Sequence, residues 1–322
     1  MNNIQENLLP NNASLDPNKA VLICAPPYQN KSAGIVVLHE LCDAIVRLGY
    51  VAHIILMDTS TSEWSFHLSE EHSFYGSDLQ RVAVPPDLGE KWIRQVLDNG
   101  ITIYPEIIVG NPLNAKHVVR YFLNGDGVVF GKKTEYQPSD FCLAFSKVFF
   151  EKPHAILTKP IRSPQLNDVN AKPSHNRSLD LTYFGKGPKY VSCFRVEGSV
   201  VLPGDWPKTK SELAILLRNT RYLYCWDNQT SVITDAVSCG TKVVLLQFVQ
   251  ADEEKLRQGE FGPIPYIKGN FDGPTLTLID NPDYDHVRNR FLEKLNKYEK
   301  EWVANVSLTL ASIFRYFGIL QK

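Results

Sequence analysis

Long apolar runs separated by a helical repeat mark the first sixty residues. The segments KAVLICAPP (19–27) and YVAHIILMD (50–58) are almost continuously apolar, which is typical of parallel strands buried on both faces. Between them, residues 35–49 place apolar side chains three and four positions apart and end on Gly49, a pattern that predicts a helix with a glycine stop. The start of the chain therefore predicts a strand–helix–strand unit.

The alternation continues and then restarts after a linker. Segment 101–109 predicts a buried strand and segment 113–124 a helix, whereas the polar stretch 61–78 predicts a loop. Residues 159–178 are rich in Pro, Asn and Ser and poor in large apolar side chains, which indicates a linker. Beyond it we expect strands at 179–185, 221–226 and 242–248, helices at 208–220 and 231–239, and one bent helix or two helices from Asp283 onward.

Strands alternating with helices on both sides of a linker predict an α/β protein with two doubly wound domains. We expect an N-terminal domain at residues 1–170, a second domain at 171–290 and a C-terminal helical segment at 291–322. A chain of 322 residues, 43% of them hydrophobic, is long enough to build two cores.

Charge and cysteine usage narrow the expected partners and compartment. Lys and Arg (34) nearly balance Asp and Glu (35) without a basic block, so we expect no nucleic acid partner. The six cysteines lie mostly in apolar runs without metal-binding spacing, as reduced thiols do. The polar first twenty residues lack the order of a signal peptide, which predicts a cytoplasmic protein. Segment 304–320 is too short and too polar to span a bilayer, which leaves peripheral association at the inner face of a membrane.

The segment YCWDNQTSVITDAVSCGTKVVLL carries the candidate chemistry. It crosses from a predicted strand into a predicted helix, where backbone N–H groups and the helix dipole favour anions. Asn228, Thr230 and Ser231 supply short polar side chains at this turn. Asp227 precedes the helix and Asp235 lies about 7 Å further along its axis, so both could accept hydrogen bonds from sugar hydroxyls. Each aspartate alone also fits a helix cap or a solvated helix residue.

This stretch resembles the donor-site signature of the retaining GT-B glycosyltransferases. In that family a carboxylate, seven residues and a second carboxylate precede a helix end and strand similar to A-x-x-C-G-T-P-V-V. Here Asp227, seven residues, Asp235 and AVSCGTKVV stand in that order. The chain has aspartate where the family usually has glutamate, and DNQTSVIT where the family is rich in glycine and proline. The run DNQTS resembles a bacterial surface-polysaccharide branch of these enzymes.

The resemblance implies two facing Rossmann-like domains (GT-B) with a cleft between them. The first domain would bind the acceptor, the second would bind a nucleotide sugar, and the C-terminal helix would pack back towards the first. Asp235 would bind the nucleotide ribose, and for a CMP-linked acidic donor a carboxylate such as Asp227 could act as nucleophile. The residues that would hold the donor sugar are Asp227, Asn228, Gln229, Thr230 and Ser231.

The turn YFGKGPKY falls where the same family places a basic residue on the donor phosphates, which makes Lys186 the candidate. Gly185 and Gly187 would let the backbone approach a ligand closely, and an ammonium there would neutralise charge on the leaving group. The same turn also fits a lysine that is merely solvated.

One carboxylate of the first domain is a catalytic candidate. Glu106 interrupts an apolar strand, and burying a carboxylate is costly unless it has partners or faces a cleft. The raised pKa of a buried carboxyl would suit proton transfer. Pro105 could instead mark a bulge or the end of the strand and leave Glu106 in solvent.

Four further residues of the first domain are candidates for the acceptor side of the cleft. The turn PYQNKSAG lacks GxGxxG, which disfavours a dinucleotide, but Ser32 and Gly34 could bring backbone to a ligand. His39 fits either a base or a packed residue. Asn111 fits the cap of the predicted helix at 113–124, with a second use in contacting the acceptor.

No metal or other cofactor is expected. Asp283 and Asp285 mimic the metal-binding DxD of another glycosyltransferase class, but they stand at a predicted helix start, where aspartates favour the dipole. The histidines show no metal-ligand spacing.

The leading hypothesis is a glycosyltransferase that moves a sugar from a nucleotide-sugar donor to a saccharide or lipid-linked glycan, in bacterial surface polysaccharide (LPS or capsule) synthesis. One alternative is a nucleotide-sugar epimerase or hydrolase with the same architecture. Another is a non-enzymatic two-lobed ligand-binding protein, because that shape also suits hinge closure.

Overall fold

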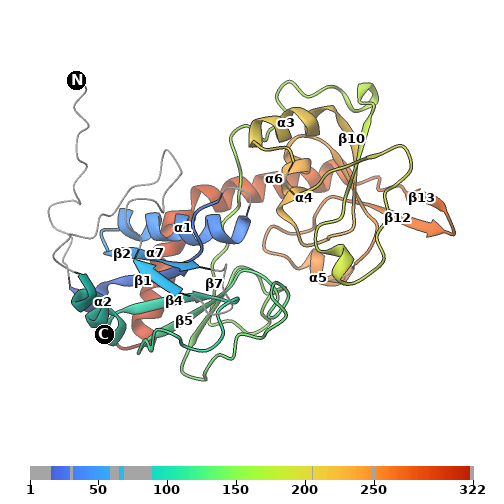
Figure 1. Cartoon of the computed structure of the whole chain (residues 1–322). Helices are drawn as coiled ribbons and strands as arrows, with labels where there is room; N and C mark the ends of the chain where they lie inside the picture. The colour runs from blue at the N-terminus through green and yellow to red at the C-terminus, as the bar shows by residue number, and fades with distance from the viewer. Residues whose placement is uncertain are drawn as a thin grey trace. The chain divides into compact units, whose positions relative to one another are not determined.

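Two compact units make up the chain (Figure 1). The computed structural model describes residues 16–29, 32–58, 65–68, 89–204, 206–248 and 251–319. The first unit comprises Met1–Lys159 and Tyr298–Lys322, and the second unit comprises Pro160–Lys297. Each unit has its own mostly parallel sheet flanked by helices, so the predicted α/β fold with two domains is confirmed.

The first unit is built on a seven-stranded sheet in the order β3-β2-β1-β4-β5-β6-β7. All neighbours are parallel except β2 and β3, which are antiparallel. The chain leaves β1 towards β2 on one side and returns to β4 on the other, which places a topological switch point between β1 and β4. The strands are β1 (Val21–Ala25), β2 (Ala52–Asp58), β3 (Ser65–Leu68), β4 (Ile101–Pro105), β5 (Val118–Phe122), β6 (Phe141–Ala144) and β7 (Ala155–Ile156).

Helices cover both faces of this sheet. Side chains alternate along a strand, so Leu22 and Cys24 of β1 share one face, where they form a core with Trp92 and Val96 of α2. Helix α1 contacts β1, β2 and α7, which accounts for the burial of the opposite face. The helical elements are η1 (Pro17–Lys19), α1 (Ala33–Arg47), α2 (Gly89–Asn99) and α7 (Trp302–Tyr316).

One predicted helix of this unit is wrong. Segment 113–124 contains strand β5, whose five residues VVRYF are all buried. Its β-branched and aromatic residues favour a strand, and the apolar spacing of the segment fits a helix by coincidence. The expected loop at 61–78 is also partly wrong, because its residues 65–68 form β3, while 61–64 and 69–78 lie outside the described residues.

The second unit has a six-stranded sheet in the order β13-β12-β11-β10-β8-β9, with β13 antiparallel and the other strands parallel. The chain leaves β8 for β9 on one side and returns to β10 on the other, so a switch point lies between β8 and β10. The strands are β8 (Leu179–Tyr183), β9 (Val200–Val201), β10 (Thr220–Cys225), β11 (Lys242–Leu245), β12 (Ile267–Asp272) and β13 (Thr275–Ile279).

The helices of this unit follow from local sequence signals. Thr209 and Glu212 form a reciprocal capping box at the start of α3, and Thr230 caps α4. Gly240, at φ +75°, follows the end of α4. The predicted helices at 208–220 and 231–239 and the pair of C-terminal helices are confirmed. The helical elements are η2 (Ser174–Asn176), η3 (Gly187–Lys189), α3 (Lys210–Asn219), α4 (Ser231–Ser238), α5 (Glu253–Arg257) and α6 (Tyr284–Lys300).

Candidate functional site

The switch point of the second unit brings two predicted site residues together. Lys186 lies three residues after β8, and Asp227 lies two residues after the adjacent strand β10. The backbone N–H of Trp226 donates to the Tyr183 carbonyl at 3.0 Å and thereby extends the pairing of the two strands into their turns. Ligands of open parallel sheets bind outside the carboxyl ends of strands at such a point, so this is the candidate site of the unit.

The Asp227 carboxylate is the centre of this site. Its Oδ2 accepts hydrogen bonds from the backbone N–H and the ammonium of Lys186 at 3.0 and 3.1 Å, and its Oδ1 accepts one from the Gln229 N–H at 3.0 Å. The Lys186 ammonium also donates to the Gln229 carbonyl at 2.8 Å. Asp227 is 1% exposed, whereas the Lys186 side chain is 24% exposed. The buried carboxylate therefore positions a lysine that reaches the surface.

Gly185 makes this close approach feasible. Its φ of +51° is unfavourable for other residues, and a Cβ at this position would lie 2.5 Å from Asp227 Oδ2 and 2.7 Å from Tyr183 Cε1. Gly187 is similarly constrained, because a Cβ there would lie 2.8 Å from Trp226 Cβ. The two glycines thus allow the Lys186 turn to pack directly on the end of β10.

The Gly185→Ala variant should therefore displace the Asp227 carboxylate. We expect the free energy of unfolding to fall by about 1–3 kcal/mol, because the substitution adds both strain at positive φ and a steric overlap. Urea unfolding followed by circular dichroism measures this change. Gly204→Ala is the matched control, since a Cβ at Gly204 meets no atom within 4 Å. Equal stability of the two variants would contradict the described geometry.

The start of α4 supplies the remaining polar groups. Gln229, Thr230 and Ser231 are half-buried, and the Thr230 hydroxyl accepts a hydrogen bond from the Val232 N–H at 3.4 Å. Asn228 is fully buried and donates to the Ala251 carbonyl at 2.6 Å, which makes it a support of the turn. The N–H groups of the first turn and the helix dipole therefore lie next to Lys186, an arrangement that favours an anion.

Tyr183, the last residue of β8, is a component that the sequence patterns did not single out. Burial raises the pKa of its phenol, a hydrogen bond with Thr230 opposes this rise, and the nearby Asp227 and Asp235 carboxylates add to it. This residue could have been found by asking which side chain ends the strand before the Lys186 turn.

Asp235 lies in a different environment from Asp227. It is 2% exposed, and its Oδ2 accepts a hydrogen bond from the ammonium of Lys210, the first residue of α3, at 3.0 Å. Burial raises the pKa of Asp235, and Lys210 partly opposes this rise. The structure therefore gives Asp235 a structural partner, while the contact with a ribose stays a prediction.

The raised pKa sets the sign of a pH effect. At pH values between the ordinary carboxyl pKa and the raised pKa of Asp235, the folded state binds more protons than the unfolded state. In this range Asp235 therefore makes the free energy of unfolding fall as pH rises. We expect Asp235→Asn to be more stable than the parent at pH 7, and the difference to vanish on acidification. Chemical unfolding at several pH values measures this, with the exposed Asp272→Asn as control. A destabilised Asp235→Asn at pH 7 would contradict the assigned sign.

Glu106 occupies the switch point of the first unit. It follows β4 directly and is 5% exposed, so the alternative of a solvated glutamate is wrong. Its Oε2 accepts a hydrogen bond from the Leu123 N–H at 3.0 Å, and its own N–H donates to the Tyr121 carbonyl at 3.2 Å. Burial raises the pKa of Glu106 to about 7. The hydrogen bond from the Leu123 N–H lowers this pKa, and Asp126 raises it by a smaller amount. A carboxyl of this kind can exchange a proton near neutral pH.

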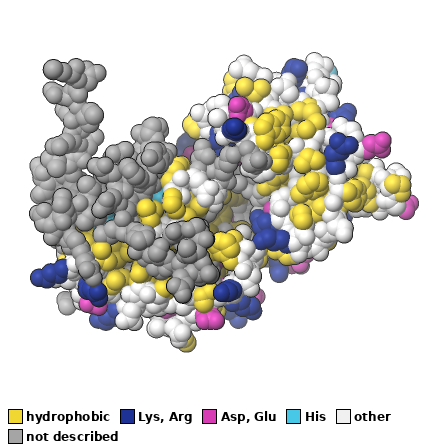
Figure 2. Space-filling view, viewed as in Figure 1, with side chains coloured by type: hydrophobic (Ala, Val, Ile, Leu, Met, Phe, Trp, Pro, Cys, Tyr) yellow, Lys and Arg dark blue, Asp and Glu magenta, His cyan; other side chains and the backbone are white. Residues whose placement is uncertain are grey.

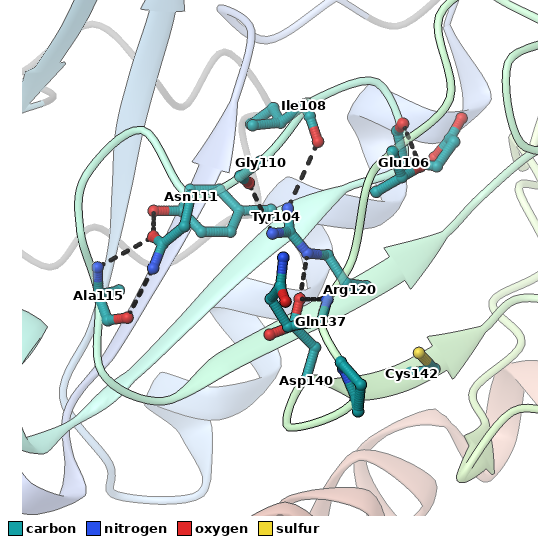
Figure 3. Close-up of polar contacts among 12 residues, drawn as sticks. Tyr104, Glu106, Ile108, Gly110, Asn111, Ala115, Arg120, Gln137, Asp140 and Cys142 are labelled. Carbon is teal, nitrogen blue, oxygen red and sulfur yellow. Dashed lines mark hydrogen bonds and ion pairs between the residues drawn. The ribbon is translucent and has the colours of Figure 1, made fainter.

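The chain between β4 and β5 is held by a buried arginine (Figure 3). Arg120 is 1% exposed and donates to Asp140 Oδ2 at 2.8 Å and to the carbonyls of Ile108 and Gly110 at 3.4 and 2.6 Å. Its guanidinium lies 5.0 Å from the centre of the Tyr104 ring. These contacts fix the segment that begins at Glu106.

Asn111 belongs to the same segment, and its expected role as a helix cap is wrong because no helix begins there. Its Oδ1 accepts hydrogen bonds from the Tyr104 hydroxyl and the Ala115 N–H, both at 2.9 Å, and its Nδ2 donates to the Ala115 carbonyl at 2.8 Å. The side-chain amide therefore closes a turn between two strands (Figure 3).

The other candidates of the first unit lie around the start of α1. Ser32 precedes this helix without a side-chain cap, and a Cβ at Gly34 would contact the Leu123 side chain at 3.7 Å. Gly34 is thus close to the residue that donates to Glu106. His39 is fully buried, with Nε2 3.0 Å from the Pro26 carbonyl and its ring edge-on to Tyr28, which favours the packed residue over the base.

The DYD motif lies at a helix start. Asp283 precedes α6, its carbonyl accepts a hydrogen bond from the Val287 N–H at 2.9 Å, and Asp285 lies in the first helical turn. Within the ranges that the structure describes, no group of three His, Cys, Asp or Glu side chains could hold a metal ion.

Comparison with known proteins gives structural likeness alone. No protein-family model and no curated protein matches the chain. It is similar to an alpha-glucosyltransferase in complex with UDP-glucose and DNA containing an abasic site, with 9% identity and a TM-score of 0.42 over 92% of this chain and 95% of the other. For an alpha-glucosyltransferase with UDP and a 13-mer DNA containing an HMU base, the values are 9% and 0.42 over 94% and 99%.

These structures correct one expectation. The balanced charge predicted no nucleic acid partner, whereas the similar structures contain DNA, so that exclusion was wrong. On the face shown in Figure 2, Lys and Arg side chains are scattered rather than gathered into one block. Among the helices of the described ranges, none is both long and apolar enough to cross a membrane.

Proposed function

We propose that this protein is a glycosyltransferase of the GT-B type that takes a sugar from a nucleotide-sugar donor. The observation that carries the proposal is the contact between Lys186 and Asp227 at the switch point of the second sheet, beside the first turn of α4. A nucleotide sugar leaves its nucleotide as a phosphate, so transfer needs positive charge where that negative charge develops. Lys186 and the N–H groups of α4 supply it.

In this proposal Lys186 contacts the donor phosphates, while Asp227 acts through Lys186 as a positioning residue. The Asp227 carboxylate already accepts three hydrogen bonds from the protein, which favours positioning over attack on the sugar. Thr230 and Ser231 line the anion site. Glu106 of the first unit is a separate candidate for proton transfer, because its pKa of about 7 suits this task.

We further propose a saccharide or lipid-linked glycan as acceptor, in the synthesis of a bacterial surface polysaccharide. The support is the resemblance of DNQTS to that branch of the GT-B enzymes, beside the resemblance of AVSCGTKVV to the family as a whole. The reaction balances as follows: the bond from the anomeric carbon to phosphate breaks, the bond to the acceptor oxygen forms, and the acceptor proton passes to a carboxylate or to the departing phosphate.

A panel of donors tests the class of function. The protein is incubated with UDP-, GDP-, dTDP- and CMP-linked sugars, and the melting temperature and the release of nucleotide are recorded with and without acceptors. The acceptors are simple saccharides, lipid-linked glycans and duplex DNA. We expect at least one donor to raise the melting temperature, and an acceptor to accelerate nucleotide release. Release that no acceptor accelerates would favour a hydrolase, and no thermal shift with any donor would exclude the proposal.

A further inference from the structure

A small polar network contacts the backbone of Glu106. Thr134 is fully buried, and its hydroxyl lies 2.8 Å from the Glu106 carbonyl and 2.6 Å from Asp126 Oδ1. The same Asp126 oxygen accepts the Thr134 N–H at 2.8 Å. The Thr134 carbonyl in turn accepts the Gly110 N–H at 3.0 Å. Thr134 thus joins the loop that carries Asp126 to the segment that begins at Glu106.

The surroundings of Glu106 contain few other charges. Among the described residues, no Lys or Arg forms an ion pair with it, and the Asp126 carboxylate makes a small contribution to its raised pKa. Tyr121 of β5 donates its phenol hydroxyl to the Leu157 carbonyl, and burial, with a smaller effect of Glu106, raises its pKa well above the ordinary value. Other charged residues of the same unit pair with one another: Arg120 with Asp140, and Glu40 of α1 with Lys159.

We propose that Asp126, which no sequence pattern pointed to, is the positioning residue of Glu106. Through Thr134 it fixes the backbone of Glu106, and its negative charge disfavours a second negative charge on the Glu106 carboxyl. The carboxyl consequently holds its proton up to a higher pH and is a stronger base once ionised. The assignment of Glu106 as proton acceptor rests on the proposed function, whereas the coupling of the two carboxyls does not.

The experiment measures the titration of Glu106 directly. The full chain is labelled with glutamate carrying ¹³C in the side-chain carboxyl, and Glu106→Gln identifies the resonance of interest. Asp126→Asn keeps an oxygen that can accept from Thr134 but removes the charge, so we expect the Glu106 midpoint to fall by on the order of half a pH unit. Asp126→Glu keeps the charge and should leave the midpoint raised.

Glu135→Gln is the matched control, because it removes a negative charge from an exposed position one residue after Thr134. Its midpoint should equal that of the parent. Equal midpoints for Asp126→Asn and the parent, or equal shifts for Asp126→Asn and Glu135→Gln, would overturn the proposal. Circular dichroism confirms that each variant is folded. If Asp126→Asn is not folded, Asp126→Ser replaces it, because it also removes the charge and keeps a side-chain oxygen.

The pH dependence of sugar transfer gives a second and separable readout. With the parent, transfer should rise as pH increases through about 7, and in Asp126→Asn this rise should move to lower pH by the same amount as the midpoint. A parent protein without any transfer would remove the proposed function and leave the titration experiment intact. If Asp126→Asn shifts the titration midpoint of Glu106 but not the pH dependence of transfer, Asp126 has no positioning role in catalysis.

Discussion

Replacing Asp227 by alanine is expected to abolish measurable binding of the donor and to destabilise the second unit. The substitution removes the acceptor of two backbone N–H groups and leaves the Lys186 ammonium with the Gln229 carbonyl but without its carboxylate. Because the Asp227 side chain is almost fully buried, we expect the free energy of unfolding to fall by about 3 kcal/mol. Urea unfolding and titration with UDP-, GDP-, dTDP- and CMP-sugars measure both effects.

The control for this variant is an ion pair of the same unit that lies nearer the surface. Asp180 and Arg221 are joined at 2.6 Å, but the Arg221 side chain is 49% exposed. Asp180→Ala should cost no more than about 1 kcal/mol and leave donor binding unchanged. If Asp227→Ala behaved like Asp180→Ala in both measurements, Asp227 would be an ordinary turn residue.

The Arg120→Met variant is expected to have the largest effect on the stability of the first unit. Methionine fills part of the volume but leaves Asp140 buried without its cation and frees the carbonyls of Ile108 and Gly110. Breaking a buried ion pair in this way costs about 3–5 kcal/mol. Chemical unfolding followed by tryptophan fluorescence measures the loss.

A second pair in the same unit provides the comparison. Arg47 and Asp43 of α1 are also 2.8 Å apart, but the Arg47 side chain is 44% exposed, so Arg47→Met should cost less than about 1 kcal/mol. The double variant Arg120→Met with Asp140→Leu should recover part of the loss, because it removes the uncompensated carboxylate. A loss below 1 kcal/mol for Arg120→Met would show that the segment after β4 is held by other contacts.

The sequence was informative where local signals and burial agree. In the second unit the caps, the glycine stop of α4 and the continuously apolar strands led to the observed elements, and these elements place Lys186 beside Asp227. The first unit was harder, because VVRYF satisfies helical spacing as well as strand composition. That ambiguity is settled by pairing between β4 and β6, which is not local information.

In the candidate site, too, contacts between residues distant in the sequence could not be predicted. Spacing indicated that Asp227 and Asp235 could share a ligand, but it could not reveal that Lys210 of α3 would form an ion pair with Asp235. Likewise, an apolar strand predicted that Glu106 could be buried, but not that Thr134, itself held by Asp126, would contact its backbone from a loop distant in the sequence. Residue type and spacing identify candidates, whereas their partners depend on tertiary contacts.

The central claim is that Lys186 binds the phosphates of a nucleotide donor, and calorimetric titration of the Lys186→Met variant tests it most directly. UDP, GDP, dTDP and CMP, and the nucleoside that corresponds to each, are titrated into the protein. Lys189→Met is the control variant from the same turn. For a nucleotide that binds the parent protein, we predict at least about tenfold weaker binding to Lys186→Met, because a charge-assisted contact contributes about 1.5–3 kcal/mol. Binding of the nucleoside should be unchanged. Equal nucleotide affinity for Lys186→Met, Lys189→Met and the parent would contradict the account.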